Sequence, residues 1–148
     1  MEASLNSIAD RLAISDLVAD FADAVNRLDA AAVTALFAPD GVWEVVNWGT
    51  HQGRDDIRAF ADELFSHWAG LMHCAHTSRV WIDGDRATGR WHVTEFGLRD
   101  GEELRVGGVY RDEYVRLDGW AFARRRFDIL FRRIGGSAPV ETYPLSEL

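Results

Sequence analysis

The sequence contains no lysine, so all 16 of its basic side chains are arginines. A lysine that forms a Schiff base and the lysine of a phosphate-binding P-loop are therefore both excluded. Cys74 is the only cysteine, which rules out a disulfide within the chain and favours a reducing compartment. No apolar run approaches the roughly 20 residues that a membrane-spanning helix needs. Acidic Glu2 and no basic segment mark the N-terminus, so no secretory signal is visible and we expect a cytoplasmic protein.

What the chain does contain is typical of a globular protein. Its 148 residues are 47% hydrophobic and 27% charged. This length predicts one domain over residues 1–148, with a tail from about residue 134. The net charge of -8 disfavours nucleic acid and an anionic membrane surface as partners, because both would repel the protein.

Three early segments have the hydrophobic spacing of helices. The first predicted helix covers about 6–28, and the second, with Asp29 as its N-cap, covers 30–37. Pro39-Asp40-Gly41 predicts a turn, and the β-branched and aromatic residues of 42–48 predict a strand. The third helix begins at Arg54-Asp55-Asp56 and ends at Gly70.

Four long strands are predicted to follow, at 71–82, 87–98, 104–117 and 120–132. Short turn signals join them, which indicates an antiparallel meander. Helices at the start and strands at the end predict an α+β fold. Strands of this length twist and curl, so we expect a curved antiparallel or mixed sheet wrapped around the three helices as a cone. A cone open at one end encloses a pocket suited to a small apolar ligand.

The strand 71–82 carries two histidines, and strand alternation places His73 and His76 on opposite faces. Because the two rings point apart and no second pair of ligands follows, we predict no metal site. The face that carries His76 would also present the apolar residues of a homodimer interface, namely Cys74, Val80 and Ile82.

Five short phrases mark the boundaries of these predicted elements: FADAVNRLD at 21–29, LFAPDGVW at 36–43, GRDDI at 53–57, DGDRA at 83–87 and YRDEY at 110–114. With the order of the elements, they resemble the SnoaL-like branch of the NTF2-like superfamily. The branch includes scytalone dehydratase, a bile-acid dehydratase, hexachlorocyclohexane dehydrochlorinase, polyketide cyclases and steroid isomerases. The resemblance implies an NTF2-like cone, a sheet-face homodimer and no cofactor.

The resemblance also implies catalytic residues. A histidine general base matches His73, a catalytic arginine matches Arg125, and the aspartate that orients the histidine matches Asn26. Asparagine can orient the ring through its carbonyl but offers no charge, so His73 is predicted to be a weaker base than in those relatives. Phe21 stands where the dehydratases often have a tyrosine, so a hydroxyl is also missing.

Further positions are expected on the wall of the cavity. Besides Phe21, the resemblance places there Trp43, Leu64, Trp68, Leu71, Val93, Val106, Tyr110 and Ile129. Alternation puts Glu95 on the same face as Val93, where the relative has an apolar residue. A buried Glu95 must be paired or protonated, and His73 and Arg125 are its candidate partners. We therefore hypothesise that Glu95 replaces the missing aspartate; the alternative is that it faces solvent at the strand end.

Arg124 and Arg126 are predicted to point away from Arg125 and to pair with acids on a neighbouring strand, such as Asp112 or Glu113. Nucleic-acid binding is a weak reading of this basic run, given the net charge.

Two classes of function remain open. The first is a cofactor-free lyase, isomerase or cyclase acting on a small apolar, aromatic or polycyclic compound. In it, His73 moves a proton, Arg125 and Tyr110 stabilise negative charge, and Asn26 orients His73 or holds a substrate oxygen. The second is a non-catalytic ligand-binding or assembly module with a decayed His–Asp dyad. A further possibility is the small subunit of a ring-hydroxylating dioxygenase.

Overall fold

The structure is a computed structural model that describes residues 2–136 and 138–143. The N-terminal half contains α1 (Glu2–Asn26), α2 (Ala30–Ala35), β1 (Phe37–Val45), β2 (Gly49–Gln52) and α3 (Arg54–Ser66). The C-terminal half contains β3 (Trp68–Asp83), β4 (Arg86–Arg99), β5 (Glu102–Arg116), β6 (Trp120–Ile134) and β7 (Glu141–Thr142).

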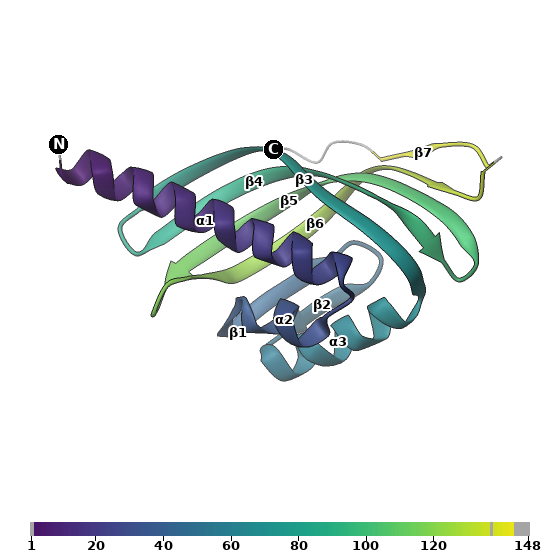
Figure 1. The fold of residues 1–148 in the computed structure, drawn as a ribbon, viewed down its shortest axis with the longest axis horizontal. Coiled ribbons are helices and arrows are strands. Elements are labelled where there is room, and N and C mark those ends of the chain that lie inside the picture. The colour runs from purple at the N-terminus through teal and green to yellow at the C-terminus, as the bar shows by residue number, and fades with distance from the viewer. Residues whose placement is uncertain (1, 137, 144–148) are drawn as a thin grey trace.

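The sheet is mixed and strongly curved, with the strand order β2-β1-β6-β5-β4-β3. Only the β1–β6 pair is parallel; all other neighbours are antiparallel. Figure 1 shows the long α1 lying across the curved strands, with α2 and α3 grouped beside β1 and β2. The predicted α+β cone, a curved mixed sheet with three helices on its concave side, is confirmed.

The helices are placed by local signals that the sequence carries. The Asp29 carboxylate accepts a hydrogen bond from the Ala32 amide at 2.9 Å and so caps α2. Leu28 takes a positive φ of 55°, which ends α1 and turns the chain into that cap. The apolar stripe of α3 is buried through Ile57, Phe60 and Phe65. None of the described helices combines the length and the apolarity that crossing a membrane requires.

The core lies between α1 and the concave face of the sheet, and Phe21 is at its centre. The Phe21 ring is fully buried and meets five other rings edge-on, all with centroids within 6.4 Å. These rings belong to Phe37, Trp43, His73, Tyr110 and Phe122. The Phe21 ring therefore fills the space between α1 and the sheet, and it brings no hydroxyl to that space.

Two parts of the expected chain path were wrong. The predicted turn Pro39-Asp40-Gly41 lies inside β1, where the register between β1 and β6 shifts between Phe37 and Val42. A β-bulge therefore takes up the residues that signalled a turn. No strand was predicted between residue 48 and the third helix, but β2 lies there. It forms a hairpin with β1 through a turn in which Asn47 and Gly49 both have positive φ.

The predicted tail from about residue 134 contains a further short strand. β7 pairs with Phe131 and Arg132 on β6, along the edge that β1 leaves free. The predicted extent of the tail beyond residue 143 lies outside the described residues.

A second bulge corrects the predicted faces of β3. Ala75 pairs with Val93 and Ser78 pairs with Trp91, so two residues of β3 oppose one residue of β4. Beyond this point the alternation is inverted, and Val80 and Ile82 pack against the core. The assignment of Val80 and Ile82 to an outer interface was therefore wrong, and Trp81 between them is 50% exposed. The homodimer itself remains a prediction.

Candidate active site

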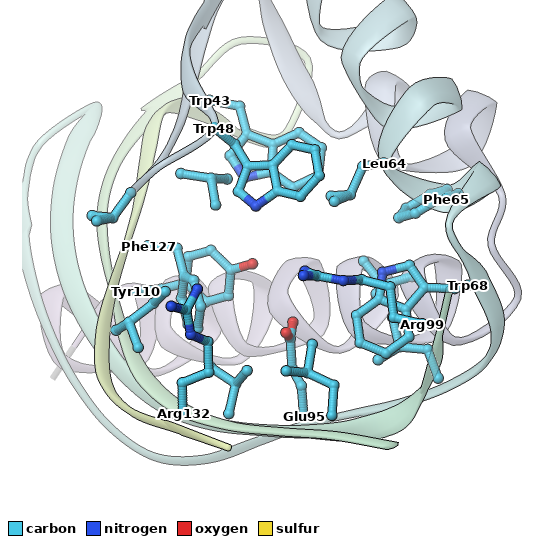
Figure 2. Close-up of a pocket in the computed structure, with 17 residues that line it drawn as sticks. Trp43, Trp48, Leu64, Phe65, Trp68, Glu95, Arg99, Tyr110, Phe127 and Arg132 are labelled. Carbon is cyan, nitrogen blue, oxygen red and sulfur yellow. The ribbon is translucent and has the colours of Figure 1, made fainter. Parts of the chain in front are cut away.

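A cavity of about 70 Å³ opens between α3, the β1–β2 hairpin, the C-terminal ends of β4 and β6 and the N-terminal part of β5. This is several times the space that one water requires. Its wall is mostly aromatic and aliphatic, with Glu95, Arg99 and Arg132 as its charged groups (Figure 2). The predicted wall positions found there are Trp43, Leu64, Trp68, Leu71, Val106, Tyr110 and Ile129.

Glu95 and His73 form the central pair of this site. The register of β3 and β4 places them directly opposite each other. His73 Nδ1 lies 2.6 Å from Glu95 Oε1, so the predicted contact between the two side chains is present. The imidazole is 1% exposed and the carboxylate is 16% exposed. Figure 2 shows the Glu95 carboxylate pointing into the cavity, which it lines.

The resemblance implies a general base at His73, and a base that contacts a ligand would line the cavity. The His73 ring is not part of the cavity wall; it is packed beside the rings of Phe21 and Tyr110, with centroids 5.9 and 5.8 Å away. The carboxylate, not the imidazole, is thus the group of this pair that a ligand would meet.

Asn26 was expected to orient the His73 ring, but its side chain binds the backbone of His73 instead. Its Oδ1 accepts a hydrogen bond from the His73 amide at 2.6 Å, and its Nδ2 donates to the His73 carbonyl at 3.1 Å. Because both ends of the side-chain amide are engaged with the backbone, Asn26 does not orient the imidazole ring. The two hydrogen bonds instead fix the main chain of β3 at the residue that faces Glu95.

Arg125 lies away from the cavity, contrary to the role expected of it. Its side chain is fully buried, with Nε 3.2 Å from Asp112 Oδ1. The guanidinium also lies 3.8 to 4.3 Å from the ring centroids of Tyr110, Phe21 and Phe122. Arg125 therefore belongs to the core and not to the cavity wall, and Asp112 is its partner because the two residues are paired across β5 and β6.

The buried acid continues into a short polar network. Tyr114 donates to Asp112 Oδ2 at 2.8 Å, and Trp91 Nε1 donates to the Tyr114 hydroxyl at 2.9 Å. Burial raises the pKa of Asp112 to about 6, against the opposing charge of Arg125 and the Tyr114 hydrogen bond. Arg124 pairs instead with Glu44 on β1, and Arg126 pairs with Asp128 on its own strand at 2.9 Å and with Glu44 at 3.4 Å. The partners named for these two arginines were therefore wrong.

Tyr110 supplies a hydrogen-bond donor to the cavity. Burial is the main cause that raises the pKa of its phenol well above the ordinary range. The hydroxyl therefore stays protonated at neutral pH, and Figure 2 shows it directed into the cavity, across from Glu95. A protonated phenol in this position can donate to an oxygen that gains negative charge.

Comparison with known proteins identifies the family of the chain. The family model of the SnoaL-like domain matches residues 6–126, which is most of the chain. The chain belongs to the SnoaL-like family.

Relatives of this SnoaL-like protein share its length and its fold. The gamma-hexachlorocyclohexane dehydrochlorinase of Sphingobium indicum is 25% identical over 130 residues, 83% of this chain and 82% of the relative. The solved hexachlorocyclohexane dehydrochlorinase of Novosphingobium barchaimii superposes with a TM-score of 0.82 at 24% identity, covering 90% and 95% of the two chains. An NTF2-like protein with a cystatin-like fold from Novosphingobium aromaticivorans has a TM-score of 0.68 at 28% identity, covering 87% of each chain.

Two of the expected wall residues of this SnoaL-like domain are packed elsewhere. Phe21 occupies the core between Arg125 and His73 and is not part of the cavity wall. Val93 is 2% exposed in the core, on β4 opposite Ala75 and the chain at Gly108. Val93 points to the concave side as strand alternation predicts, and Phe21 reaches that side from α1, but neither lines the cavity.

Sequence reasoning missed three polar or amphipathic wall residues: Trp48, Arg99 and Arg132. Arg99 could have been found, because it shares its strand face with Val93 and Glu95. Arg132 could not, since a register shift pairs Gly107 with Phe131 but Gly108 with Ile129, which brings both Ile129 and Arg132 to the cavity. Trp48 belongs to the turn between β1 and β2, and the sequence does not show on which side of the sheet a side chain of that turn lies.

Proposed function

We propose that the protein is a cofactor-free lyase or isomerase that removes a proton from a small, largely apolar ring compound. The observation that carries the proposal is the Glu95–His73 pair. The Glu95 carboxylate lines an aromatic cavity, and the His73 imidazole, outside the cavity wall, is hydrogen-bonded to it. A positioned acid–base group of this kind contributes about 10²- to 10⁴-fold to a rate.

Each group then has a distinct task. Glu95 accepts the proton as the C–H bond of the substrate breaks, and the electron pair moves toward a carbonyl oxygen or expels a leaving group. His73 is a positioning residue, because its contact with the substrate runs through Glu95. The Tyr110 hydroxyl donates to the oxygen on which charge develops. Return of the proton at another carbon completes an isomerisation, whereas departure of the leaving group completes an elimination.

The relatives support this reaction class. The dehydrochlorinase from Sphingobium indicum is named for loss of hydrogen chloride from a chlorinated ring, which is a proton removal coupled to departure of chloride. The present chain departs from the resemblance at Asn26, and the proposed exchange of roles between Glu95 and His73 accounts for that departure.

A non-catalytic ligand-binding module is the second candidate. It is favoured by the burial of His73 and Arg125, neither of which lines the cavity. In that case the cavity binds a ring compound without changing it, and Glu95 is only a polar contact.

Deuterium exchange tests the two candidates without knowledge of the natural leaving group. The protein is incubated in D₂O with a set of cyclic ketones, and loss of the α-proton signals is followed by NMR; chloride release from gamma-hexachlorocyclohexane is measured in parallel. We expect exchange or elimination above the buffer rate, with a loss of at least about 10²-fold in Glu95→Gln. Glu113→Gln, at an exposed strand position, is the matched control. A Glu95→Gln variant that retains the wild-type rate would contradict the proposed base.

A further inference from the structure

Arg99 is a positively charged residue of the cavity wall that has no carboxylate partner among the described residues. It ends β4, four residues after Glu95, and Figure 2 shows its guanidinium pointing into the cavity. It lies over the indole rings of Trp48 and Trp68, with its Cζ 5.6 and 6.0 Å from their centroids. Among residues 2–136 and 138–143, Arg99 has no carboxylate within ion-pair distance, although many of the other arginines do.

The other charged groups of the cavity are already paired. Arg132 holds the Glu141 carboxylate of β7, with Nη2 2.6 Å and Nε 2.9 Å from the same oxygen. Glu95 is hydrogen-bonded to His73. Among the described residues, Arg99 is therefore the charged group of the cavity whose guanidinium has no carboxylate partner.

An arginine in this setting is suited to a carboxylate. Its two indole neighbours lie within cation–π distance of the guanidinium, and the planar fork of N–H donors matches the two oxygens of a carboxylate. An anion bound there loses much of its water, which strengthens its attraction to the guanidinium. A doubly charged phosphate would need more than one unpaired cation, so a carboxylate is the better match.

Resting on the proposed function, we propose that the substrate is a ring compound with a carboxylate substituent, held by Arg99. The carboxylate binds the guanidinium, and the ring lies among Trp48, Trp68 and Leu64. Since Arg99, Glu95 and the Tyr110 hydroxyl all point into one cavity, the anchored ring meets the proposed base and the proposed donor (Figure 2). Arg99 is thus a specificity-determining residue.

Calorimetry with benzoate and benzamide tests this proposal, because the two probes have nearly the same shape and differ in charge. We expect the wild-type protein to bind benzoate at least about tenfold more tightly than benzamide, as charge-assisted hydrogen bonds predict. Arg99→Gln should abolish this preference, because the benzoate affinity then falls to about that of benzamide. Arg90→Gln is the matched control: Arg90 is also on β4 and also lies over an indole, with its Cζ 5.4 Å from the Trp81 ring, but it does not line the cavity.

A benzoate affinity no greater than that of benzamide, including the case in which neither binds, overturns the proposal. Preference for benzoate that persists in Arg99→Gln overturns the role of Arg99. The measurement involves no turnover, so it is independent of the proton-transfer test. If Glu95→Gln leaves the exchange rate unchanged but Arg99-dependent benzoate binding is found, the proposed function fails while the carboxylate site stands.

Discussion

Asn26 and His73 are joined by two hydrogen bonds, and neither of them involves the imidazole. β3 is the last strand of the sheet, so the amide and the carbonyl of His73 on its outer edge have no neighbouring strand. The side-chain amide of Asn26 supplies both a donor and an acceptor and acts as a one-residue partner for that edge. The asparagine thereby fixes the backbone that holds His73 opposite Glu95.

Replacing Asn26 by aspartate should destabilise the protein. Aspartate has no N–H to donate, and its charge would face the His73 carbonyl that Asn26 now satisfies. We expect the free energy of unfolding to fall by about 1–3 kcal/mol, measured by urea denaturation. Asp20→Asn, at an exposed position of α1, should change it by less than about 0.5 kcal/mol. An Asn26→Asp protein as stable as the wild type would show that the bond from Asn26 Nδ2 to the His73 carbonyl contributes nothing.

His73→Gln should reduce the proposed reaction less than Glu95→Gln does. His73 holds the carboxylate but is not part of the cavity wall, so its loss leaves the proton acceptor in place with poorer orientation. We expect kcat to fall by about tenfold or more with KM little changed, against a loss of at least about 10²-fold for Glu95→Gln. Steady-state kinetics of both variants decide the matter. A larger loss in His73→Gln than in Glu95→Gln would make the imidazole the base.

The outcome of sequence reasoning depended on whether strand alternation stayed in phase. It placed Glu95 on the cavity face, with His73 and Arg125 as candidate partners, and this held because β3 and β4 pair without interruption between Met72 and Ala75. The same rule failed for Val80 and Ile82, beyond the bulge. A bulge adds one residue to a strand and leaves no distinct signature in the sequence.

The partners of the arginines on β6 were missed for a different reason. β6 lies between β5 and β1, and its pairing with β1 is parallel and remote in sequence. Glu44 is therefore the partner of Arg124, a contact that no local pattern encodes. Arg126 lies 3.4 Å from Glu44 but has a nearer partner in Asp128, two residues along β6. Asp112 then remains for the buried Arg125.

The Asp112 carboxyl should make stability fall as pH rises from about 4 to 6. The folded protein raises the pKa of Asp112 to about 6, from an ordinary value of 3.8 in the unfolded chain. Between these values the folded state binds more protons than the unfolded state, so raising the pH costs stability, and the effect is complete above about pH 6. Asp112→Asn removes this titration.

Urea denaturation of the wild type and of Asp112→Asn at a series of pH values provides the check. The free energy of unfolding of the wild type minus that of the variant should decrease from pH 4 to 6 and then stay level. Asp118→Asn, in the exposed turn before β6, should give a difference from the wild type without this dependence. A difference that increases with pH in this window contradicts the assignment.

Gly97 should resist replacement by alanine, whereas Gly70, its neighbour across the β3–β4 pair, should accept it. A Cβ on Gly97 would lie 2.0 Å from the carbonyl oxygen of Gly70, which is backbone and cannot rotate away; a Cβ on Gly70 meets nothing within 4 Å. Gly97→Ala would force the strands apart between Glu95 and Arg99. We expect it to lower the free energy of unfolding by about 1–3 kcal/mol.

The paired glycine substitutions also connect the sheet to the cavity. Gly70→Ala should leave stability unchanged or raise it by up to about 1 kcal/mol, because alanine narrows the freedom of the unfolded chain. Gly97→Ala should in addition weaken benzoate binding, since it displaces the strand segment that carries both Glu95 and Arg99. Urea denaturation and calorimetry on the two variants measure both effects. Equal stability of Gly97→Ala and Gly70→Ala would mean that the close approach of the two strands relaxes without cost.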